Sequence, residues 1–468
     1  MEALLAKYNQ NLSDDSHISN KDVQVIPPIQ ESTLINNENP FYLPYNNRAY
    51  DKQFFKLYQY RLNVLRKRVY DKAHKLWQDH PYMKKVLDIE YGSACWSIGA
   101  IYCEMKYKPD VLEEVSNDVY GSPDLITKYS DEQNDEIMLE DESGRVLLKN
   151  LKKKFVTGTV VGVLGQENDD GDFEVLDICF PQDLPINECI PTTSTTTSTT
   201  TTTSTTTTTT TTTTIPLDST PSFPSSSPSK EGNVAFISGL NISSDNLSSV
   251  QLLQDYLIGA LSLTTHNISK LYILGNSIKD IDNLTNLQHF LINIVQSVDV
   301  QILPGFHDPS DKSLPQQPLN DKLFAKKNLH NYLELTTNPS VSIIENNNME
   351  MLLTSGENLN DIFKYNYIQQ TRQQMMELTL QCQNIAPTAP DTLFCYPFDD
   401  KDPFVLDKWP NVYVVGNQPS YFEFMTTSIG GNTSSKGIKC IGVPDFSKTH
   451  GLVVFNTNTL YTELVSLS

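Results

Sequence analysis

Apolar residues gather in short runs through the second half of the chain, as in buried strands. Strands are predicted at residues 234–238, 271–274 and 300–303, and each run ends in a turn that contains glycine. Helices are predicted between them at residues 247–263 and 283–298, where apolar residues recur at steps of three and four. This alternation predicts parallel strand pairing through crossover connections, with the loops at the strand ends forming any site.

The remaining pattern extends this arrangement to the end of the chain. Further strands are predicted at residues 341–344, 349–353, 412–415, 421–425, 437–441 and 452–456. A helix is predicted among them, at residues 369–383. We therefore expect residues 232–468 to form a two-sheet α/β sandwich flanked by helices.

Residues 91–190 predict a small β-barrel. Its strands are expected at residues 94–107, 136–141, 145–149, 155–164 and 173–180. The last two flank residues 169–171 (DDG), which strongly indicate a hairpin. Strands of this number and length fit an OB-fold. Such folds often bind single-stranded nucleic acid, but the only nearby basic cluster is Lys152, Lys153 and Lys154. An OB-fold that docks a protein is therefore favoured.

The segment at residues 51–90 predicts an amphipathic helix, which covers residues 51–77. The expected buried stripe consists of Phe54, Tyr58, Leu62, Leu65, Val69 and Leu76. The opposite face carries Lys52, Lys56, Arg61, Arg66, Lys67, Arg68, Lys72 and Lys75. A basic face of this kind can contact nucleic acid or a membrane. A solvated or acid-facing outer side is favoured, because the rest of the chain is acidic.

Two segments show no such periodicity. Residues 1–50 are rich in Asn, Ser and Pro and predict an irregular N-terminal arm. Residues 191–231 are dominated by Thr, Ser and Pro and predict a disordered linker, because few apolar side chains offset the entropy of ordering. Such tracts resemble mucin stalks, and Asn241 and Asn283 begin formal glycosylation sequons. The N-terminus lacks the pattern of a signal peptide, which favours an intracellular protein.

Charge and cysteine content exclude several classes of protein. The net charge of −21, from 35 basic and 56 acidic residues, argues against a general DNA or RNA clamp. The seven cysteines form no CxxC pair, which argues against a zinc ribbon, an iron–sulfur cluster and a disulfide scaffold. No stretch approaches the roughly 18 consecutive apolar residues of a membrane span. We expect a soluble protein with reduced cysteines.

The strand-end turns have the arrangement of a two-metal phosphoesterase but lack almost all of its ligands. Such an enzyme has Asp-x-His, Gly-Asp, Gly-Asn-His-Asp and Gly-His-x-His at these turns, with one carboxylate bridging two cations. The corresponding positions here are Gly239, Asn241, Asn276, Phe306, His307, Asp308, Asn417 and Pro419. Glycine, proline and phenylalanine supply no ligand, and neutral asparagine replaces the bridging aspartate. We therefore predict no catalytic residue, no metal and no other cofactor.

His307 and Asp308 leave one alternative open. They could serve a residual metal-dependent phosphoesterase or nuclease together with nearby loop carboxylates. A lone histidine beside a lone aspartate is more often a satisfied structural pair, so the inactive interpretation is favoured. The sequence contains no Ser-His-Asp constellation with local support, no GxxxxGK[ST] and no GxGxxG.

The second half of the chain contains four distinctive sequence blocks, at residues 304–319 (PGFHDPSDKSLPQQPL), 354–365 (TSGENLNDIFKY), 386–397 (APTAPDTLFCYP) and 443–446 (VPDF). These blocks resemble those of the small, regulatory subunits of DNA polymerase delta, which belong to the B-subunit family of replicative polymerases. Residues 51–62 and 156–159 extend the likeness into the helix and the barrel. The resemblance covers nearly the whole chain except the N-terminal arm and the Thr-rich tract.

This resemblance implies an OB-fold packed on an inactivated calcineurin-like phosphodiesterase domain in a nuclear protein of DNA replication and repair. The implied partners are the cysteine-rich C-terminal domain of the catalytic subunit and a third accessory subunit. Polymerase zeta is a further implied partner, whereas DNA would be contacted only indirectly and a membrane not at all. The family's delta members already lack the metal ligands, so the departure here is the Thr-rich tract between the two domains.

Overall fold

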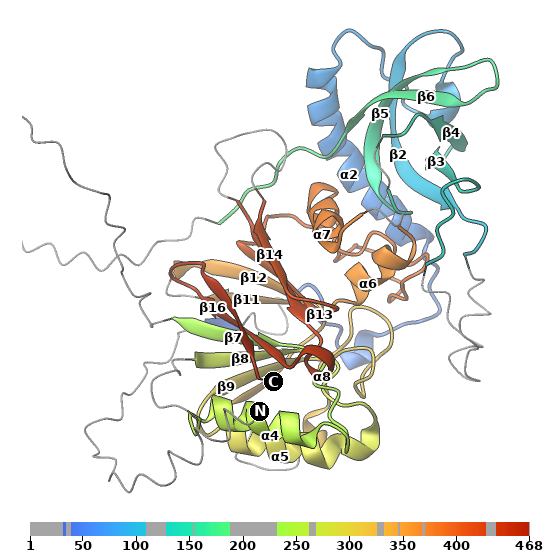
Figure 1. The fold of residues 1–468 in the computed structure, drawn as a ribbon. Coiled ribbons are helices and arrows are strands. Elements are labelled where there is room, and N and C mark those ends of the chain that lie inside the picture. Colours follow the sequence, from blue (N-terminus) through green and yellow to red (C-terminus); the bar gives the residue numbers. More distant parts are fainter. Residues whose placement is uncertain are drawn as a thin grey trace, which may run out of the picture.

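The protein consists of a small β-barrel beside a sandwich of two β-sheets, with one long helix reaching along both (Figure 1). The structure, a computed structural model, describes residues 31–33, 39–108, 128–152, 155–187, 232–261, 268–324, 332–344, 347–366, 370–426 and 437–467. The Thr-rich linker predicted at residues 191–231 lies outside the described residues, as do Lys153 and Lys154 of the basic cluster.

The barrel contains the five strands that the sequence predicts. They are β2 (Cys95–Glu104), β3 (Glu136–Glu140), β4 (Arg145–Lys149), β5 (Val160–Glu167) and β6 (Phe173–Cys179). The barrel closes in the order β2-β3-β4-β6-β5. Its interior is filled by alternate apolar side chains, among them Ile101, Leu139, Val163 and Phe173. The predicted small barrel is therefore confirmed.

The sandwich consists of two six-stranded sheets. The first has the order β10-β9-β8-β7-β16-β17, with β7 (Asn233–Ile237), β8 (Ile268–Leu274), β9 (Asp299–Leu303), β10 (Leu333–Leu335), β16 (Gly451–Asn456) and β17 (Thr462–Ser466). The second has the order β1-β11-β12-β13-β15-β14, with β1 (Glu31–Thr33), β11 (Ser340–Ile344), β12 (Met349–Thr354), β13 (Val412–Gln418), β14 (Phe422–Met425) and β15 (Lys439–Pro444).

The central strands of both sheets run parallel, as the alternation of strands and helices predicts. In the first sheet, β7, β8 and β9 pair in parallel, and in the second β12, β13 and β15 do so. The antiparallel strands lie toward the edges. The edge strands β1, β10 and β17 were not predicted from the sequence pattern. Phe236, Tyr272, Leu353 and Val414 belong to the apolar layer between the two sheets.

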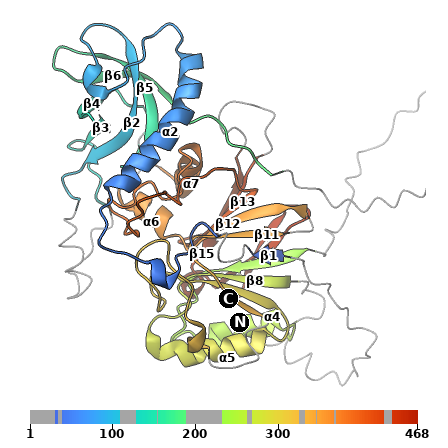
Figure 2. The same cartoon turned by 180° about the vertical axis from the view of Figure 1, so that it is seen from behind.

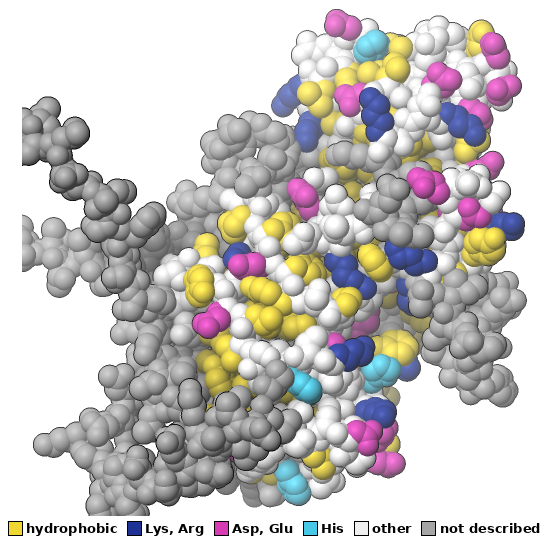
Figure 3. Space-filling model, in the orientation of Figure 1, with side chains coloured by type: hydrophobic (Ala, Val, Ile, Leu, Met, Phe, Trp, Pro, Cys, Tyr) yellow, Lys and Arg dark blue, Asp and Glu magenta, His cyan; other side chains and the backbone are white. Residues whose placement is uncertain are grey.

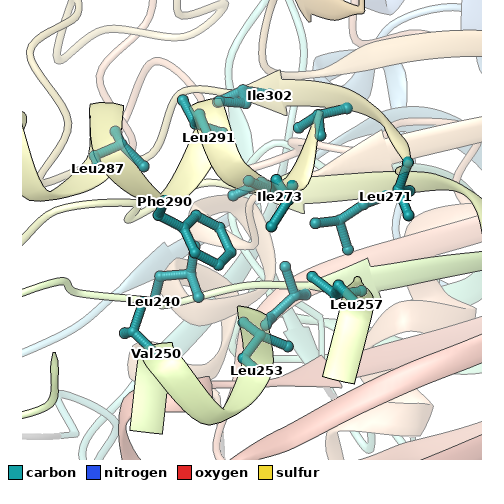
Figure 4. Close-up of a cluster of buried hydrophobic side chains, with 14 of the residues drawn as sticks. Leu240, Val250, Leu253, Leu257, Leu271, Ile273, Leu287, Phe290, Leu291 and Ile302 are labelled. Atoms are coloured by element: carbon teal, nitrogen blue, oxygen red, sulfur yellow. The ribbon is translucent and has the colours of Figure 1, made fainter. Parts of the chain in front are cut away.

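Helices cover the outer face of each sheet. On the first sheet lie α4 (Leu247–Leu257) and α5 (Leu284–Ile294), whose Leu253 and Phe290 pack on Ile273 (Figure 4). On the second sheet, toward the barrel, lie α6 (Glu357–Lys364) and α7 (Arg372–Gln381) (Figure 1). The short helix α8 (Phe446–Thr449) follows β15. In the part of the chain that the structure describes, none of the helices has the length and apolar character that a membrane crossing requires.

The long helix α2 (Phe55–Leu76) forms where the sequence predicts it, but its buried face differs from the predicted stripe. The buried residues are Leu57, Arg61, Leu65, Val69 and Ala73, one row at steps of four. Phe54, Tyr58 and Leu76, predicted to be buried, are 37%, 37% and 59% exposed. The reason is that Leu57 packs on the sandwich while Leu65 and Val69 pack on the barrel, which fixes one narrow contact row.

Arg61 fits the acid-facing alternative predicted for the basic face, but it is buried and does not lie on an outer side of the helix. Its side chain is 1% exposed, and its Nε donates to the Asp402 carboxylate at 2.7 Å. Its Nη1 donates to the carbonyl oxygen of Pro387 at 2.8 Å. Arg66 forms two hydrogen bonds with the Glu142 carboxylate on the barrel side. This part of the basic face therefore lies between the domains and connects them.

The N-terminal arm, predicted to be irregular, is attached to the sandwich where the structure describes it. Strand β1 pairs antiparallel with β11. Gln317 holds the following segment, because its Oε1 accepts from Leu43 N at 2.9 Å and its Nε2 donates to Phe41 O at 3.0 Å. Phe41 is itself buried in the apolar core. The segment runs along the sandwich to the start of α2 (Figure 2).

Candidate functional site at the strand ends

The turns after the parallel strands meet at one edge of the sandwich. Gly239, which follows β7, donates its N–H to Gly275 O at 3.0 Å. Asn241 donates its N–H to Asn276 O at 2.8 Å. The Asn276 side chain in turn accepts the N–H of His307 at 3.1 Å. Backbone groups of adjacent turns therefore connect the first three predicted positions.

Asn417 brings the second sheet into the same site. Its Nδ2 donates to Leu274 O at 3.0 Å and to Ser355 O at 2.7 Å. Its backbone N–H donates to the Ser238 hydroxyl at 2.8 Å. Pro419 is exposed two residues further on. Hydrogen bonds therefore bring the predicted positions 239, 241, 276, 307 and 417 together. Pro419 takes part in none of these hydrogen bonds.

Four of these positions have left-handed backbone geometry. The φ angles are +61° at Gly239, +41° at Asn241, +54° at Asn276 and +52° at Asn417. Glycine adopts this region freely, and asparagine tolerates it better than most other residues. The asparagines therefore serve the shape of tight turns and bond to backbone groups.

The space beside Gly239 is closed. A Cβ atom at this position would lie 2.7 Å from Asp445 Oδ1 and 2.8 Å from Asn417 Oδ1. The Asp445 oxygen already accepts the N–H and the hydroxyl of Ser447, at 3.0 and 2.6 Å. The other carboxylate oxygen pairs with Lys448 at 3.0 Å. An aspartate cannot replace Gly239 unless its neighbours move.

Asp308 lies beneath the site and connects two turns. It is 6% exposed and accepts the N–H groups of Ser277 at 2.8 Å, Ile278 at 3.3 Å and Gly305 at 2.9 Å. Burial raises the pKa of Asp308 to about 7, although the three backbone donors act in the opposite direction. Its described hydrogen bonds are made to backbone amides and not to the neighbouring His307.

His307 and Phe306 point to the outside of the turn. Both are exposed, and their rings pack edge to face with centroids 5.4 Å apart. Lys312 places its ammonium group 3.9 Å from the centroid of the Phe306 ring. The aromatic side chain therefore contributes a cation–π contact at the surface.

A second polar cluster, which was not predicted from the sequence, lies beside the site. Asn338 donates its Nδ2 to Gln316 Oε1 at 2.7 Å and accepts the N–H of Ser355 at 3.0 Å. Gln316 donates to Gly305 O at 3.1 Å, and the Glu357 carboxylate accepts from the Ser355 hydroxyl. Gln316 and Ser355 lie in the sequence blocks at residues 304–319 and 354–365. The resemblance of these blocks to a known family was the sequence signal that could have identified both residues.

The residues present do not fit a two-metal centre. Among the described residues, no group of three or more His, Cys, Asp or Glu side chains could hold a metal ion. Asn417 Oδ1 is buried without a hydrogen-bond partner, and the Asp445 carboxylate, which also lies close to Gly239, is already bonded to Ser447 and Lys448. The bridging position holds Asn276, whose neutral amide accepts a backbone N–H. No metal-dependent step follows from this arrangement.

Two family models match separate parts of the chain. Residues 53–178 match a family model described as the DNA polymerase delta subunit OB-fold domain. Residues 234–423 match a second family model, which describes the B subunit of DNA polymerases alpha and epsilon. The two matches correspond to α2 with the barrel and to most of the sandwich.

Three similar proteins are named DNA polymerase delta small subunit. The chain is 40% identical over 525 aligned positions to the DNA polymerase delta small subunit of Saccharomyces cerevisiae, with 100% of both chains covered. It is 31% identical to the protein of that name from Arabidopsis thaliana, with 89% of this chain and 91% of the relative covered. The corresponding protein of Oryza sativa is 30% identical, with 89% and 93% covered.

Proposed function

The chain belongs to the family of DNA polymerase delta small subunits, and on this premise we propose that it is a non-catalytic scaffold of that polymerase. It bridges the C-terminal domain of the catalytic subunit and a third accessory subunit during DNA replication and repair in the nucleus. Polymerase zeta is a further candidate partner. In this proposal the sandwich is an inactivated calcineurin-like phosphodiesterase domain, retained for its surface.

The closed strand-end site is the observation that carries this proposal. Gly239 has no space for a ligating side chain, and the amides of Asn276 and Asn417 are bonded to backbone groups. A two-metal enzyme needs a bridging carboxylate and several imidazoles in the same place. In this chain, the residues at these positions stabilise tight turns instead, which supports a role that depends on the shape of the molecular surface.

The contacts between the domains suit a scaffold that holds two partners at a fixed separation. The buried Arg61–Asp402 pair connects α2 with the sandwich. Gly158 of the barrel lies so close to the sandwich that a Cβ atom there would be 1.9 Å from Pro387 O. Since buried ion pairs and close-packed backbones resist sliding, the two domains offer a single continuous surface to other subunits.

Co-expression with both other subunits tests the bridging role. Affinity purification through a tag on the catalytic subunit should recover the third subunit only when this chain is present. A matched control is the full chain without residues 192–229, which should restore recovery fully because this tract is predicted to be a flexible surface insertion. Equal recovery of the third subunit in the absence of this chain would contradict the proposal.

A further inference from the structure

Two positively charged side chains lie against one aromatic ring between the sandwich and the barrel. The ring belongs to Phe363 in α6. Lys128 places its ammonium group 4.3 Å from the ring centroid, and Arg372 places its guanidinium carbon 4.4 Å from it. Lys128 precedes barrel strand β3, whereas Arg372 is the first residue of α7. Segments of both domains therefore bring two like charges together, which is unfavourable unless an anion offsets their repulsion.

Arg372 is positioned by neutral amide groups. Its Nη1 donates to Asn360 Oδ1 at 2.6 Å and to Gln418 Oε1 at 3.0 Å. Within the described part of the chain, its Nε and Nη2 have no hydrogen-bond partner. Burial lowers the pKa of Arg372 to about 10, and no described carboxylate counteracts this effect. The edge of the guanidinium formed by Nε and Nη2 has the spacing that two oxygen atoms of one oxyanion require.

The residue that follows Lys128 fixes it against α6. Tyr129 donates its N–H to Lys364 O at 2.9 Å, and its ring stacks on the ring of Tyr365 with centroids 5.3 Å apart. Burial and the nearby charge of Arg372 both lower the pKa of Lys128. Because the segments that carry the two cations are already ordered, a ligand that binds both loses little conformational entropy in the protein.

The acidic groups of the surrounding segments do not neutralise this pair. Among the residues that the structure describes, no carboxylate raises the pKa of Arg372 or of Lys128. The neighbouring Lys364 is exposed and adds a third positive charge. Figure 3 shows Lys and Arg side chains gathered beside α6 and α7. Carboxylates of these segments have hydrogen-bond partners of their own, namely Asp131 with Asn134, Glu357 with Ser355, Asp361 with Thr388 and Thr392, and Glu377 with Gln381. In a chain of net charge −21, such a group of cations suits an external anion.

The charge of the pair indicates which anion fits. A carboxylate carries one negative charge, whereas a phosphate monoester is close to a dianion above pH 7 and can neutralise both cations. A nucleic-acid strand carries one charge per phosphodiester and requires a longer row of cations, with aromatic faces free for stacking bases. Here both cations lie against the ring of Phe363, which favours a single phosphate group.

We propose that Arg372 and Lys128 form a binding site for the phosphate group of a small molecule, either inorganic phosphate or a nucleoside monophosphate. Arg372 binds two phosphate oxygens through Nε and Nη2, and Lys128 binds a third oxygen as a point charge. The site adjoins the strand-end turns, because Asn360 also donates its Nδ2 to Asn417 O at 3.4 Å. The proposed scaffold function does not depend on this site.

The test is a calorimetric titration of the purified full chain with inorganic phosphate, thymidine 5′-monophosphate and thymidine, at pH 8 and constant ionic strength. The variants are Arg372→Gln and Lys128→Gln, which lie on different segments, so that a folding defect in one leaves the other informative. The control is Arg145→Gln, because its charge is already paired with Glu140 at 2.7 Å. We expect one phosphate site per chain and no binding of thymidine. The phosphate affinity should fall about tenfold or more in each cation variant and stay within about twofold of wild type in the control.

The two phosphate compounds distinguish the source of the ligand. Binding of thymidine 5′-monophosphate that is tighter than that of phosphate assigns the site to a nucleotide, whereas equal or weaker binding assigns it to inorganic phosphate. The absence of saturable phosphate binding in the wild-type chain overturns the proposal, as does unchanged affinity in both cation variants. Oligothymidine binding that is lost in these variants, without phosphate binding, overturns it in favour of nucleic acid.

A further variant tests whether carboxylates of the chain itself are the ligand. Residues 109–127, outside the described residues, contain Asp110, Glu113, Glu114, Asp118 and Asp124. The variant replaces these five residues by Asn or Gln, and we expect its phosphate affinity to stay within about twofold of wild type. Phosphate binding that appears only in this variant overturns the proposal, because the carboxylates of this segment would then occupy the site. All of these outcomes leave the proposed function standing, since recovery of the third subunit tests it separately.

Discussion

Individual asparagines determine the shape of the strand-end turns. Asn241, Asn276 and Asn417 all have positive φ angles. A larger branched residue would strain such turns, whereas the amide also supplies donors and acceptors for orphaned backbone groups. The same residues carry no charge, so none of them could hold a pair of divalent cations. At this scale, the asparagines contribute turn geometry and hydrogen bonds rather than charge.

Asp308 gives a prediction at the residue scale. Replacing it with Asn leaves at least one of the three backbone donors without a good acceptor, which should lower the free energy of unfolding by about 1–3 kcal/mol. Chemical denaturation of the full chain measures this loss. The control is His307→Ala, which changes the exposed neighbour and should leave stability unaltered.

The pH dependence of that loss has a defined sign. Burial raises the pKa of Asp308 to about 7, above its unfolded value, so the folded state retains the proton more strongly. The contribution of protonated Asp308 to the free energy of unfolding is therefore complete below about pH 4, and it is lost as the pH rises through 7. Asp308→Asn should cost more at pH 5 than at pH 8. A larger cost at pH 8 would mean that the three backbone donors outweigh burial.

At the scale of elements, helix α2 and one barrel turn join the domains. The row of buried residues on α2 divides between the sandwich core and the barrel core. At the same junction, the barrel turn at Gly158 approaches the 386–397 block of the sandwich, where Pro387 accepts from Arg61. Two sequence blocks that are far apart along the chain are thus parts of one contact.

Gly158→Ala tests this junction. The residue has φ of +88° and a Cβ atom would lie 1.9 Å from Pro387 O, so the substitution combines backbone strain with a clash. We expect a loss of at least about 2 kcal/mol in the free energy of unfolding, measured by chemical denaturation. Gly171→Ala is the matched control, since it has φ of +83° and its nearest contact would be Glu167 Oε1 at 4.0 Å.

Only the strain is common to both glycines, so the control should lose about 1 kcal/mol. Equal losses in the two variants would show that the close approach to Pro387 contributes nothing, and that the domains are joined elsewhere.

Local patterns predicted the regular elements, and long-range contacts produced the differences. The barrel strands and the parallel strands β7, β8 and β9 form where alternation and turn residues place them. Helix α4 ends at Leu257 rather than at residue 263, and Gly259 with φ of +81° follows it. Arg61 could not be predicted as buried, because its partner Asp402 is 341 positions away. The spacing of apolar residues in a helix carries no information about so distant a partner.

The candidate site was predictable as a set of turns but not as a network. Gly239, Asn276 and Asn417 follow predicted strands, so their convergence follows from parallel pairing. Asp445 and Asn338 lie in segments whose approach to the site depends on the complete two-sheet fold. Their hydrogen bonds, which close the site, are therefore visible only in three dimensions.

At the scale of the whole molecule, the closed site and the joined domains support one account. In the proposed function, the chain retains a two-domain fold for the surfaces that it offers to other subunits. An enzyme would have needed an accessible group of carboxylates and imidazoles at the sandwich edge. The central claim is that this edge performs no chemistry.

The most direct measurement of that claim is Mn²⁺-dependent hydrolysis of a phosphodiester by the purified full chain. The account predicts a rate equal to that of buffer with Mn²⁺, and the same rate for the His307→Ala variant. A metal-dependent rate above buffer that falls about 100-fold or more in His307→Ala would contradict it, because that result would make His307 a working general acid or base.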